Sequence, residues 1–396
     1  MLEPDYIRNM TRRLRRIAQD MEDDVIAAII AALLVMLDGE PPTEAEVAEE
    51  VSEIVEKYQI EGSAELRRIF KDAVETNITN DAAAVSEAEK VAQESLDTPL
   101  TSQIPQIEPQ KVPADSFPDL TKETRFGPSK DVQEALSDPY TRELINHFHR
   151  QTQATWQNLT DTFAYEGTRA YVNAADAAAV QVSTGTSSRE AIDDAIEKLN
   201  ADGITVVENP ETGHRDHVDV AMERNVRTTV SQLAGDLTLQ SCKRNGMSLV
   251  LVSAHYGARP THAVWQGKVY SLTGDTDKYK DFYRETEYGQ MLGLCGINCR
   301  HSFSPFAEGM HNPYEGKDFN DPQRYKDEQT QRAMERRIRK LRREKKALDE
   351  EYKKIKTPEL KERRRRVAEA LKEAVSEYEE FCAVHGFRPL WERTRV

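Results

Sequence analysis

The chain has 396 residues, a net charge of −15 and 38% hydrophobic residues, against the roughly 45–50% that is usual for globular proteins. Its length predicts roughly two to three domains, while the low hydrophobic fraction excludes one large compact core. The charge is uneven, because residues 331–396 carry 21 Lys or Arg and only 13 Asp or Glu. The rest of the chain is therefore strongly acidic, and the two ends are expected to meet different partners.

The longest apolar run lies at 25–37 and has 13 residues, whereas a membrane-spanning helix needs roughly 20. Basic residues precede this run, but acidic residues separate the two and no small-residue cleavage site follows. We therefore expect a buried helix, with no targeting segment and no membrane contact. The four cysteines are too few for a disulfide scaffold of this size, which predicts synthesis in a reducing cytoplasm.

The N-terminal region, 1–98, is predicted to be helical throughout. Apolar residues with helical spacing, continued by the run at 25–37, predict one long helix at the start of the chain. A capping box at 43–46 opens the next helix. The helices expected after the first lie at about 43–58, 63–77 and 80–96. Six prolines follow within 99–129, where we expect a linker or an extended arm without regular structure, since proline fixes φ and removes a donor.

Helical patterns resume in the region 130–244, with a first helix expected over about 130–182. A second capping box at Ser187–Glu190 opens a helix to about Asn200. A short strand at 204–207, a turn at 209–213 and a helix over about 216–243 are expected next. The segments 248–253 and 268–272 then have strand-like patterns among frequent glycines. These features predict a small, loop-rich α+β module at about 245–315.

The tail, 316–396, is charged and helical. Ile338, Leu341 and Leu348 occupy a and d positions of a heptad pattern, and Thr357-Pro358 interrupts the pattern and starts a second helix. The two helices are expected to form an antiparallel hairpin or to pair as a coiled coil with another chain, for example a second copy of this one. The predicted fold class is mainly α, with long helices, the Pro-rich linker, the small α+β module and this tail.

Five side chains that can bind a soft or borderline metal fall within the α+β module: His255, His262, Cys295, Cys299 and His301. Imidazole and thiolate together suit zinc, which usually takes four tetrahedral ligands. Three interpretations are open. The cluster is a structural zinc site, or a small core in which these side chains hydrogen-bond the loops, or a hydrolytic zinc site with Glu285 or Glu287 as general base.

The same residues carry a family resemblance. The strings SAHYGARPTHAVWQGKVYSL and GLCGINCRHSFSPF resemble the signature of the phage minor capsid protein 2 family, which is related to the MuF-like phage head morphogenesis proteins. The resemblance covers about 216–310. Besides the histidines and Cys299, the motif positions are Gly257, Arg259, Pro260, Trp265, Gly267, Lys268, Asn298, Arg300 and Phe303. Cys295 fits the motif less well, so the preferred zinc ligands are His255, His262, Cys299 and His301, with Cys295 as a substitute.

The resemblance implies a minor capsid or head morphogenesis protein of a tailed phage, with no catalytic role for the motif residues. Such a protein would be assembled in the bacterial host cytoplasm and carried in the virion, at the portal vertex or in the capsid interior. The implied partners are the portal protein, the major capsid or scaffolding protein, and double-stranded DNA. The alternative is a zinc-dependent enzyme, hydrolytic or toxin-like, carried in the virion, although the sequence lacks a P-loop, GxSxG and HExxH.

Several basic residues have two interpretations. Arg259 and Arg300 would either grip a carboxylate or phosphate or brace backbone carbonyls. The tail carries a basic run of Arg363, Arg364, Arg365 and Arg366. This run would either neutralise phosphates of a polyanion such as DNA, with binding that weakens in salt, or belong to a solvated helix held by salt bridges.

Overall fold

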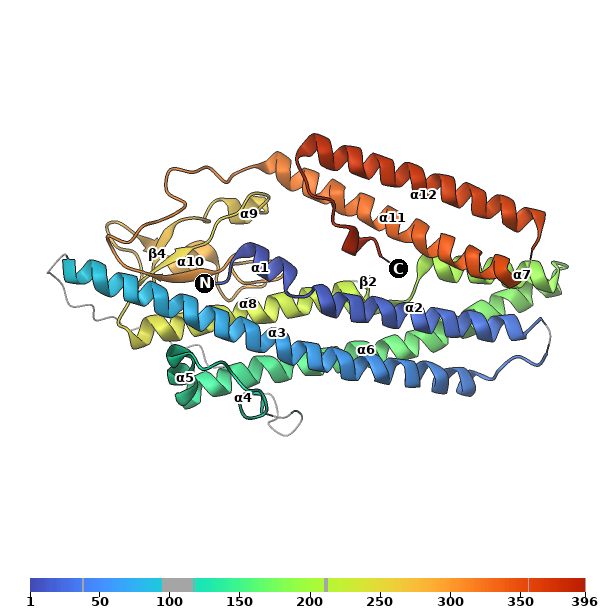
Figure 1. Ribbon diagram of the computed structural model, residues 1–396, viewed down its shortest axis with the longest axis horizontal. Coiled ribbons are helices and arrows are strands. Elements are labelled where there is room, and N and C mark those ends of the chain that lie inside the picture. The colour runs from blue at the N-terminus through green and yellow to red at the C-terminus, as the bar shows by residue number, and fades with distance from the viewer. Residues whose placement is uncertain (38, 95–116, 118, 210–212, 355, 396) are drawn as a thin grey trace. The chain divides into compact units, whose positions relative to one another are not determined.

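The computed structural model describes the whole chain except residues 38, 95–116, 118, 210–212, 355 and 396. The fold is mainly α, as predicted (Figure 1). The chain divides into two compact units. The first unit comprises Met1–Arg13, Ser63–Thr155 and Met222–Tyr325, and the second comprises Leu14–Gly62, Trp156–Ala221 and Lys326–Val396. Each unit thus collects segments that are far apart in the sequence.

The N-terminal region differs from prediction in where its helices break. Instead of one long first helix, the chain forms α1 (Pro4–Asn9) and α2 (Arg12–Val35). At the break, the Thr11 side chain is fully buried and its hydroxyl donates to Glu223 over 3.2 Å. A long-range contact therefore coincides with this break, and the local apolar spacing does not indicate it.

Where three further helices were expected, the chain forms a single helix, α3 (Glu44–Glu94). Its predicted capping box is confirmed: the Thr43 N–H donates to Glu46 Oε2 over 2.8 Å, and the Glu46 N–H donates to Thr43 Oγ1 over 3.3 Å. The helix continues through Gly62, where the Trp156 ring packs so closely that a Cβ would lie 2.3 Å from a ring carbon. The Trp156 indole N–H also donates to the Gln59 carbonyl over 3.0 Å.

Most of the predicted Pro-rich arm, 99–129, lies outside the described residues. Its described end contains a short helix, α4 (Leu120–Glu123), which corrects the expectation of no regular structure. The Asp119 carboxylate caps this helix by accepting from the Thr121 and Lys122 N–H groups. The helix expected over about 130–182 is two helices, α5 (Lys130–Ser137) and α6 (Pro139–Ser183).

The following segment agrees with prediction except for one additional strand. Ser187 accepts from the Glu190 N–H and caps α7 (Ser188–Asp202). Strand β1 (Thr205–Asn209) pairs antiparallel with β2 (His214–His217), which was not predicted. Residues 210–212 of the predicted turn lie outside the described residues. Helix α8 (Val218–Arg244) follows, and Gly246 then has a positive φ of 62°.

The α+β module contains a four-stranded sheet of order β5-β4-β3-β6. The predicted strands are confirmed as β3 (Leu249–Val252) and β4 (Val269–Ser271), whereas β5 (Lys280–Asp281) and β6 (Phe303–Phe306) were not predicted. Short helices α9 (Pro260–Ala263) and α10 (Phe282–Thr286) lie in its connections. The core beneath the sheet joins Trp265, Tyr270 and Phe303 to Val85 of α3 and Leu239 of α8.

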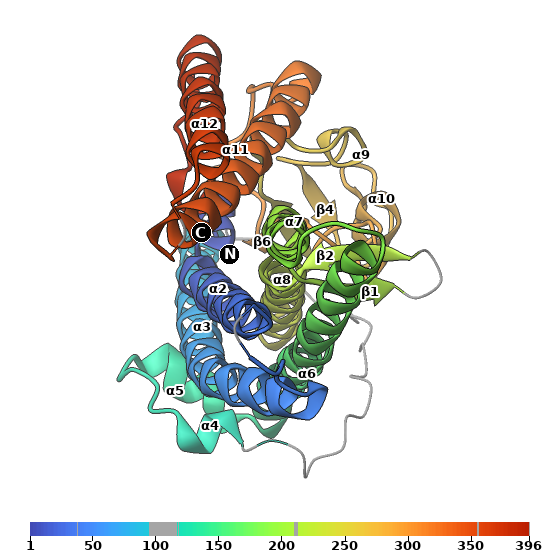
Figure 2. The same cartoon turned by 90° about the vertical axis from the view of Figure 1, so that its right-hand side faces the viewer.

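The tail is an antiparallel hairpin of α11 (Pro322–Lys354) and α12 (Pro358–His385), followed by a 3₁₀ turn, η1 (Trp391–Arg393). The two helices lie side by side in both views (Figures 1 and 2). Ile338 and Leu348 of α11 pack on apolar residues of α12, so the heptad residues bury one another within the chain. No helix in the described part of the chain combines the length and apolarity that a membrane span requires.

Candidate metal centre

The pairing of β3 with β6 brings the two halves of the His/Cys motif together. Val252, the last residue of β3, lies opposite Phe303, the first residue of β6. The pairing extends beyond the strands, because the Ser253 N–H donates to the Ser302 carbonyl over 2.9 Å. His255 and His301 therefore leave the same end of the sheet, and their rings stack with centroids 4.3 Å apart.

Three of the four preferred ligands converge on one point. Nδ1 of His262 and Nδ1 of His301 each lie 3.7 Å from Sγ of Cys299, and the ligand atoms of the three residues lie within 4.8 Å of one another. All three side chains are at most 2% exposed. Among the described residues, this is the cluster of His, Cys, Asp or Glu side chains whose spacing suits a metal ion.

The surrounding hydrogen bonds fix which ring nitrogens carry protons. His262 Nε2 lies 2.8 Å from the Leu292 carbonyl, which only accepts, so Nε2 is protonated. His301 Nε2 lies 3.0 Å from Gln266 Oε1. The Gln266 amide is oriented because its oxygen accepts from the His255 N–H and its nitrogen donates to the Phe319 carbonyl. His301 Nε2 is therefore also protonated, and both Nδ1 lone pairs face Cys299.

This arrangement leaves one thiol proton for two nitrogen lone pairs, so the thiol can satisfy only one of them. A cation would satisfy both. Tetrahedral zinc with ordinary bond lengths places its nitrogen and sulfur ligands roughly 3.6 Å apart, and the two nitrogen–sulfur distances here are 3.7 Å. The Nε2–H bonds to Leu292 and Gln266 are the outer hydrogen bonds that metal-binding histidines usually make. The three residues therefore fit a zinc-like ion.

The remaining candidates lie beside this point. His255 Nδ1 lies 2.9 Å from the Tyr256 carbonyl, while His255 Nε2 is buried and has no hydrogen-bond partner among the described residues. Its stacking on His301 makes it the nearest candidate for a fourth ligand. The Cys295 thiol instead donates to the His301 carbonyl over 3.8 Å. Neither residue belongs to the converging group.

Burial sets the charge of the cluster. Burial lowers the pKa of His262 to about 4 and that of His255 to about 3, and it lowers the pKa of His301 as well. Burial also raises the pKa of the Cys299 thiol. At neutral pH the histidines are thus uncharged, which is their metal-binding form, and a bound cation would have to displace the thiol proton.

The glycine and asparagine positions of the motif allow backbone conformations and close contacts that most other residue types disfavour. Asn298 has a left-handed φ of 57°, a region that asparagine tolerates better than most residues. A Cβ at Gly296 would lie 2.4 Å from the Met291 carbonyl oxygen. Gly257 and Gly267 also have positive φ angles, of 72° and 70°. In the loop that carries Cys299, a side chain at Gly296 would collide with the backbone.

The basic motif residues hold carbonyl groups. Arg259 donates to the Ile297 carbonyl over 2.5 Å, and Arg300 donates to the Gly257 carbonyl over 3.3 Å. The Lys268 ammonium donates to the Val264 carbonyl over 2.6 Å. Of the other motif residues, Pro260 begins α9, and Trp265 and Phe303 are buried in the core of the module.

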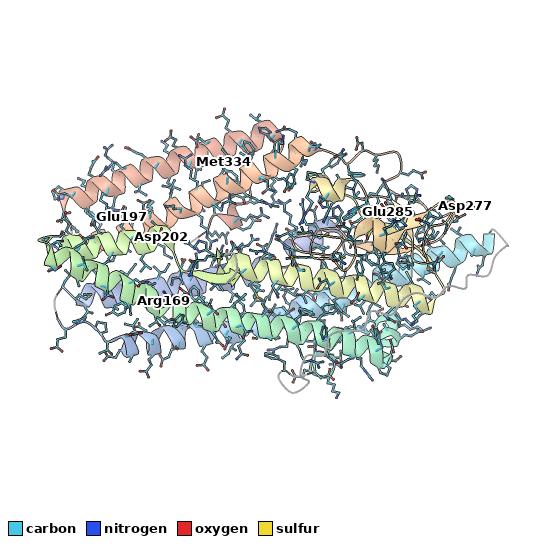
Figure 3. All side chains as sticks on the ribbon, turned by 180° about the vertical axis from the view of Figure 1, so that it is seen from behind. Arg169, Glu197, Asp202, Asp277, Glu285 and Met334 are labelled. Atoms are coloured by element: carbon cyan, nitrogen blue, oxygen red, sulfur yellow. The ribbon has the colours of Figure 1, made fainter. Side chains whose placement is uncertain are left out.

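The two glutamates considered as a general base lie apart from the cluster. Glu285 of α10 (Figure 3) forms an ion pair with Arg284 at 3.0 Å and is 40% exposed. Glu287 ends α10 in a left-handed conformation. Neither belongs to the group formed by His262, Cys299 and His301. Sequence reasoning did not single out Gln266, which orients His301, because nothing in a sequence shows where a side-chain amide will form its hydrogen bonds.

The arginine run of the tail is divided among different partners. Arg363 forms an ion pair with Glu197 of α7 (Figure 3), and Arg364 pairs with Asp349 at 2.5 Å. Arg365 pairs with two carboxylates, those of Glu362 at 2.6 Å and Glu369 at 2.8 Å, whereas Arg366 is exposed. The four consecutive residues therefore point in several directions around the helix.

Comparison with known proteins relates this sequence to structural components of phage particles. The sequence profile described as phage minor capsid protein 2 matches residues 116–376. A structural protein of Lactococcus phage LL-H is 26% identical over 243 residues, which are 56% of this chain and 65% of that protein. The chain thus spans just under two thirds of that relative's length. No solved structure matches. The profile covers more than half of the chain, which therefore belongs to the phage minor capsid protein 2 family.

Proposed function

We propose that this protein is a minor structural component of a tailed-phage head, located at the portal vertex or on the inner capsid surface. It is assembled in the bacterial cytoplasm and contacts the portal protein, the major capsid or scaffolding protein, and the packaged double-stranded DNA. The observation that carries the proposal is the family match over 116–376, which includes the whole His/Cys cluster. The similarity to a phage structural protein supports the same role.

Within this role, the His/Cys cluster is a structural zinc site that holds the loops of the α+β module together and makes the module rigid. Its burial supports this, since the three converging residues are at most 2% exposed. The Nδ1 lone pairs directed at Cys299 support it independently. A structural rather than hydrolytic site is favoured because no carboxylate belongs to the group within the described residues, although a water-activating zinc usually works with a nearby base.

The structural role is tested on particles. Quantitative mass spectrometry of purified virions and of DNA-free heads should detect this chain in both, in a fixed ratio to the portal protein. Co-expression with tagged portal protein should recover it in a complex, and the major capsid protein serves as the second bait. Absence from purified particles would contradict the head location, while presence in particles without recovery by the portal would contradict the portal contact alone.

The zinc site is tested by elemental mass spectrometry of the full chain, purified without chelators. The wild type should hold about one zinc per chain, and Cys299→Ser and His301→Ala should lose it together with thermal stability. Cys242→Ser is the matched control, because Cys242 is a buried free cysteine outside the cluster. A wild type without metal would remove the zinc proposal and would leave the head role untouched.

A further inference from the structure

The tail hairpin contains a basic groove, which lies wholly within the second unit. Its volume is about 610 Å³, and residues of α11, α12 and the C-terminal segment line it. The cationic side chains that line it are Arg342, Lys345, Lys346, Lys353, Arg364 and Arg395. Asp349 is the carboxylate in the lining, and the Tyr352 ring forms part of the wall. Among the lining side chains that the structure describes, cations therefore outnumber carboxylates six to one.

Three of these cations are paired with described carboxylates. Asp349 is shared between Lys345 and Arg364, each at 2.5 Å. Lys346 pairs with Asp23 at 2.9 Å. Arg342 donates to neutral groups instead, the hydroxyl and carbonyl of Thr394 at 2.7 and 3.0 Å.

The two arginines at one end of the groove repel each other. Burial, together with the nearby charge of Arg395, lowers the pKa of Arg342. An anion between these side chains would relieve both the repulsion and the desolvation, because it would supply the countercharge that Thr394 cannot supply.

The cations of α11 form a row. Residues 342, 346 and 353 recur at spacings of four and seven, which places them on one helix face over roughly 16 Å. Arg364 reaches the groove from the facing helix. Converging guanidinium and ammonium groups suit a tetrahedral oxyanion, which accepts hydrogen bonds in several directions, better than they suit a single planar carboxylate.

We propose that this groove binds phosphate groups of an extended polyanion, held by Arg342 and Arg395 at one end and by the α11 lysines along its length. The shared chemistry is a phosphate ester or anhydride, and the source is the phosphodiester backbone of a nucleic acid or a free pyrophosphate-type ligand. If the ligand is nucleic acid, this groove is where the genome contact proposed above is made, and the inference then rests on that proposed function. If the ligand is a free pyrophosphate-type molecule, the inference does not depend on the genome contact. The arginine run at 363–366 enters this groove only through Arg364.

The test uses the full chain and two probes, a labelled 20-base-pair duplex followed by anisotropy and sodium pyrophosphate followed by calorimetry. The groove variant is Arg342→Gln with Arg395→Gln. The control is Arg336→Gln with Lys340→Gln, because these α11 residues are exposed, lie outside the groove and change the net charge equally. Arg395→Glu alone is a second variant, since its exposed side chain can change without loss of the Arg342 contact with Thr394.

The groove variant is expected to bind the duplex, pyrophosphate or both at least tenfold more weakly than the wild type, and the control variant less than twofold more weakly. Arg395→Glu is expected to lose affinity for the same probe as the groove variant. Weakening of both probes, with pyrophosphate displacing the duplex, supports the nucleic-acid source. Weakening of pyrophosphate alone supports a free phosphate ligand and removes only the genome contact at this groove. Equal losses in groove and control variants, binding of neither probe, or equally effective displacement by polyglutamate would each overturn the proposal.

Discussion

The Arg339 guanidinium donates to the Asp219 carboxylate over 2.8 Å, although the two residues are 120 positions apart in the chain. Both belong to a cluster of charges inside the second unit. Glu22 is fully buried and forms ion pairs with Arg339 and Arg343. His217 Nδ1 lies 2.9 Å from the same carboxylate. The cluster thus joins α2, β2 and the start of α8 to the tail helix α11.

Such a cluster selects one packing arrangement more than it adds stability. Removing charges from water costs several kcal/mol per ion, and the attraction between partners roughly offsets that cost only when every partner is in place. The tail helix can therefore pack here in one register, with both arginines facing Glu22. A shift of α11 by one residue would leave buried charges without partners.

Replacing Glu22 by Gln is expected to destabilise the second unit by about 3–5 kcal/mol, since two buried arginines lose their shared countercharge. Asp23→Asn is the matched control on the next residue. Asp23 pairs with Lys346, whose side chain is 55% exposed, and an exposed pair contributes only about 0–1 kcal/mol. Urea unfolding measures both variants, and equal losses would show that the buried cluster has no special role.

The stability of the second unit is expected to fall in acid between about pH 4 and pH 2. Burial alone would raise the pKa of Asp219, but Arg339 and neighbouring cations lower it from 3.8 to about 2. Because the folded pKa lies below the unfolded one, the carboxylate stabilises the fold above pH 4 and loses this effect as the pH falls through 2. Asp219→Asn should flatten this part of the stability curve. An unchanged acid slope would contradict the assignment.

Gly203→Ala is expected to disrupt the same cluster, because the added methyl group would collide with two of its side chains. Gly203 has a φ of +64°, and a Cβ there would lie 2.7 Å from both Arg343 Nη1 and Glu22 Oε1. Gly185→Ala is the control, because it also has a positive φ but has no atom within 4 Å of the added Cβ. We expect Gly203→Ala to cost about 1–3 kcal/mol more than the control. Equal decreases in the melting temperature of the two variants would mean that Gly203→Ala destabilises only through its positive φ and not by disturbing the charge cluster.

In the first unit, Asp236→Asn is expected to be stabilising at pH 8 and nearly neutral at pH 4. Burial raises the pKa of Asp236 from 3.8 to about 6, while its hydrogen bond from the Tyr288 hydroxyl at 2.6 Å opposes the rise. A raised carboxyl pKa means that the folded state favours the protonated form, so the wild type loses stability as the pH rises from about 4 through 6. Asparagine keeps the acceptor for Tyr288 without the charge.

The gain at pH 8 should be on the order of 2–3 kcal/mol, the equivalent of a shift of about two pKa units. Urea unfolding of wild type and variant across pH 4–8 measures it. A variant that is less stable than wild type throughout this range would contradict the raised pKa.

Parts of the structure whose cause is local could be predicted. The capping boxes at Thr43 and Ser187 formed as expected, because their hydrogen bonds join residues three positions apart. The hairpin α11–α12 is one of the two arrangements predicted from heptad spacing and the break at Thr357, the other being a coiled coil with another chain. The strands β5 and β6 were not predicted, since β5 has only two residues and β6 contains Pro305, a residue that argues against a strand in the middle of a sheet.

In the candidate site as well, local features could be predicted and features that depend on distant residues could not. The sequence supplied the residue types His262, Cys299 and His301 together with the family signature around them. It did not show that Nδ1 rather than Nε2 of each histidine faces the sulfur, which depends on the Leu292 carbonyl and on Gln266. Nor did it indicate that His255 stacks beside the converging group rather than joining it.

By itself, the sequence determined the mainly helical fold, the capping boxes and the strands β3 and β4, because periodicity and capping act over a few residues. Only the tertiary structure decided which helices break or continue and which buried charges meet. The break between α1 and α2 coincides with the bond from Thr11 to Glu223, and α3 continues through Gly62, where Trp156 packs. Glu22 meets Arg343 across 321 positions, and only packing of the folded chain brings such residues together.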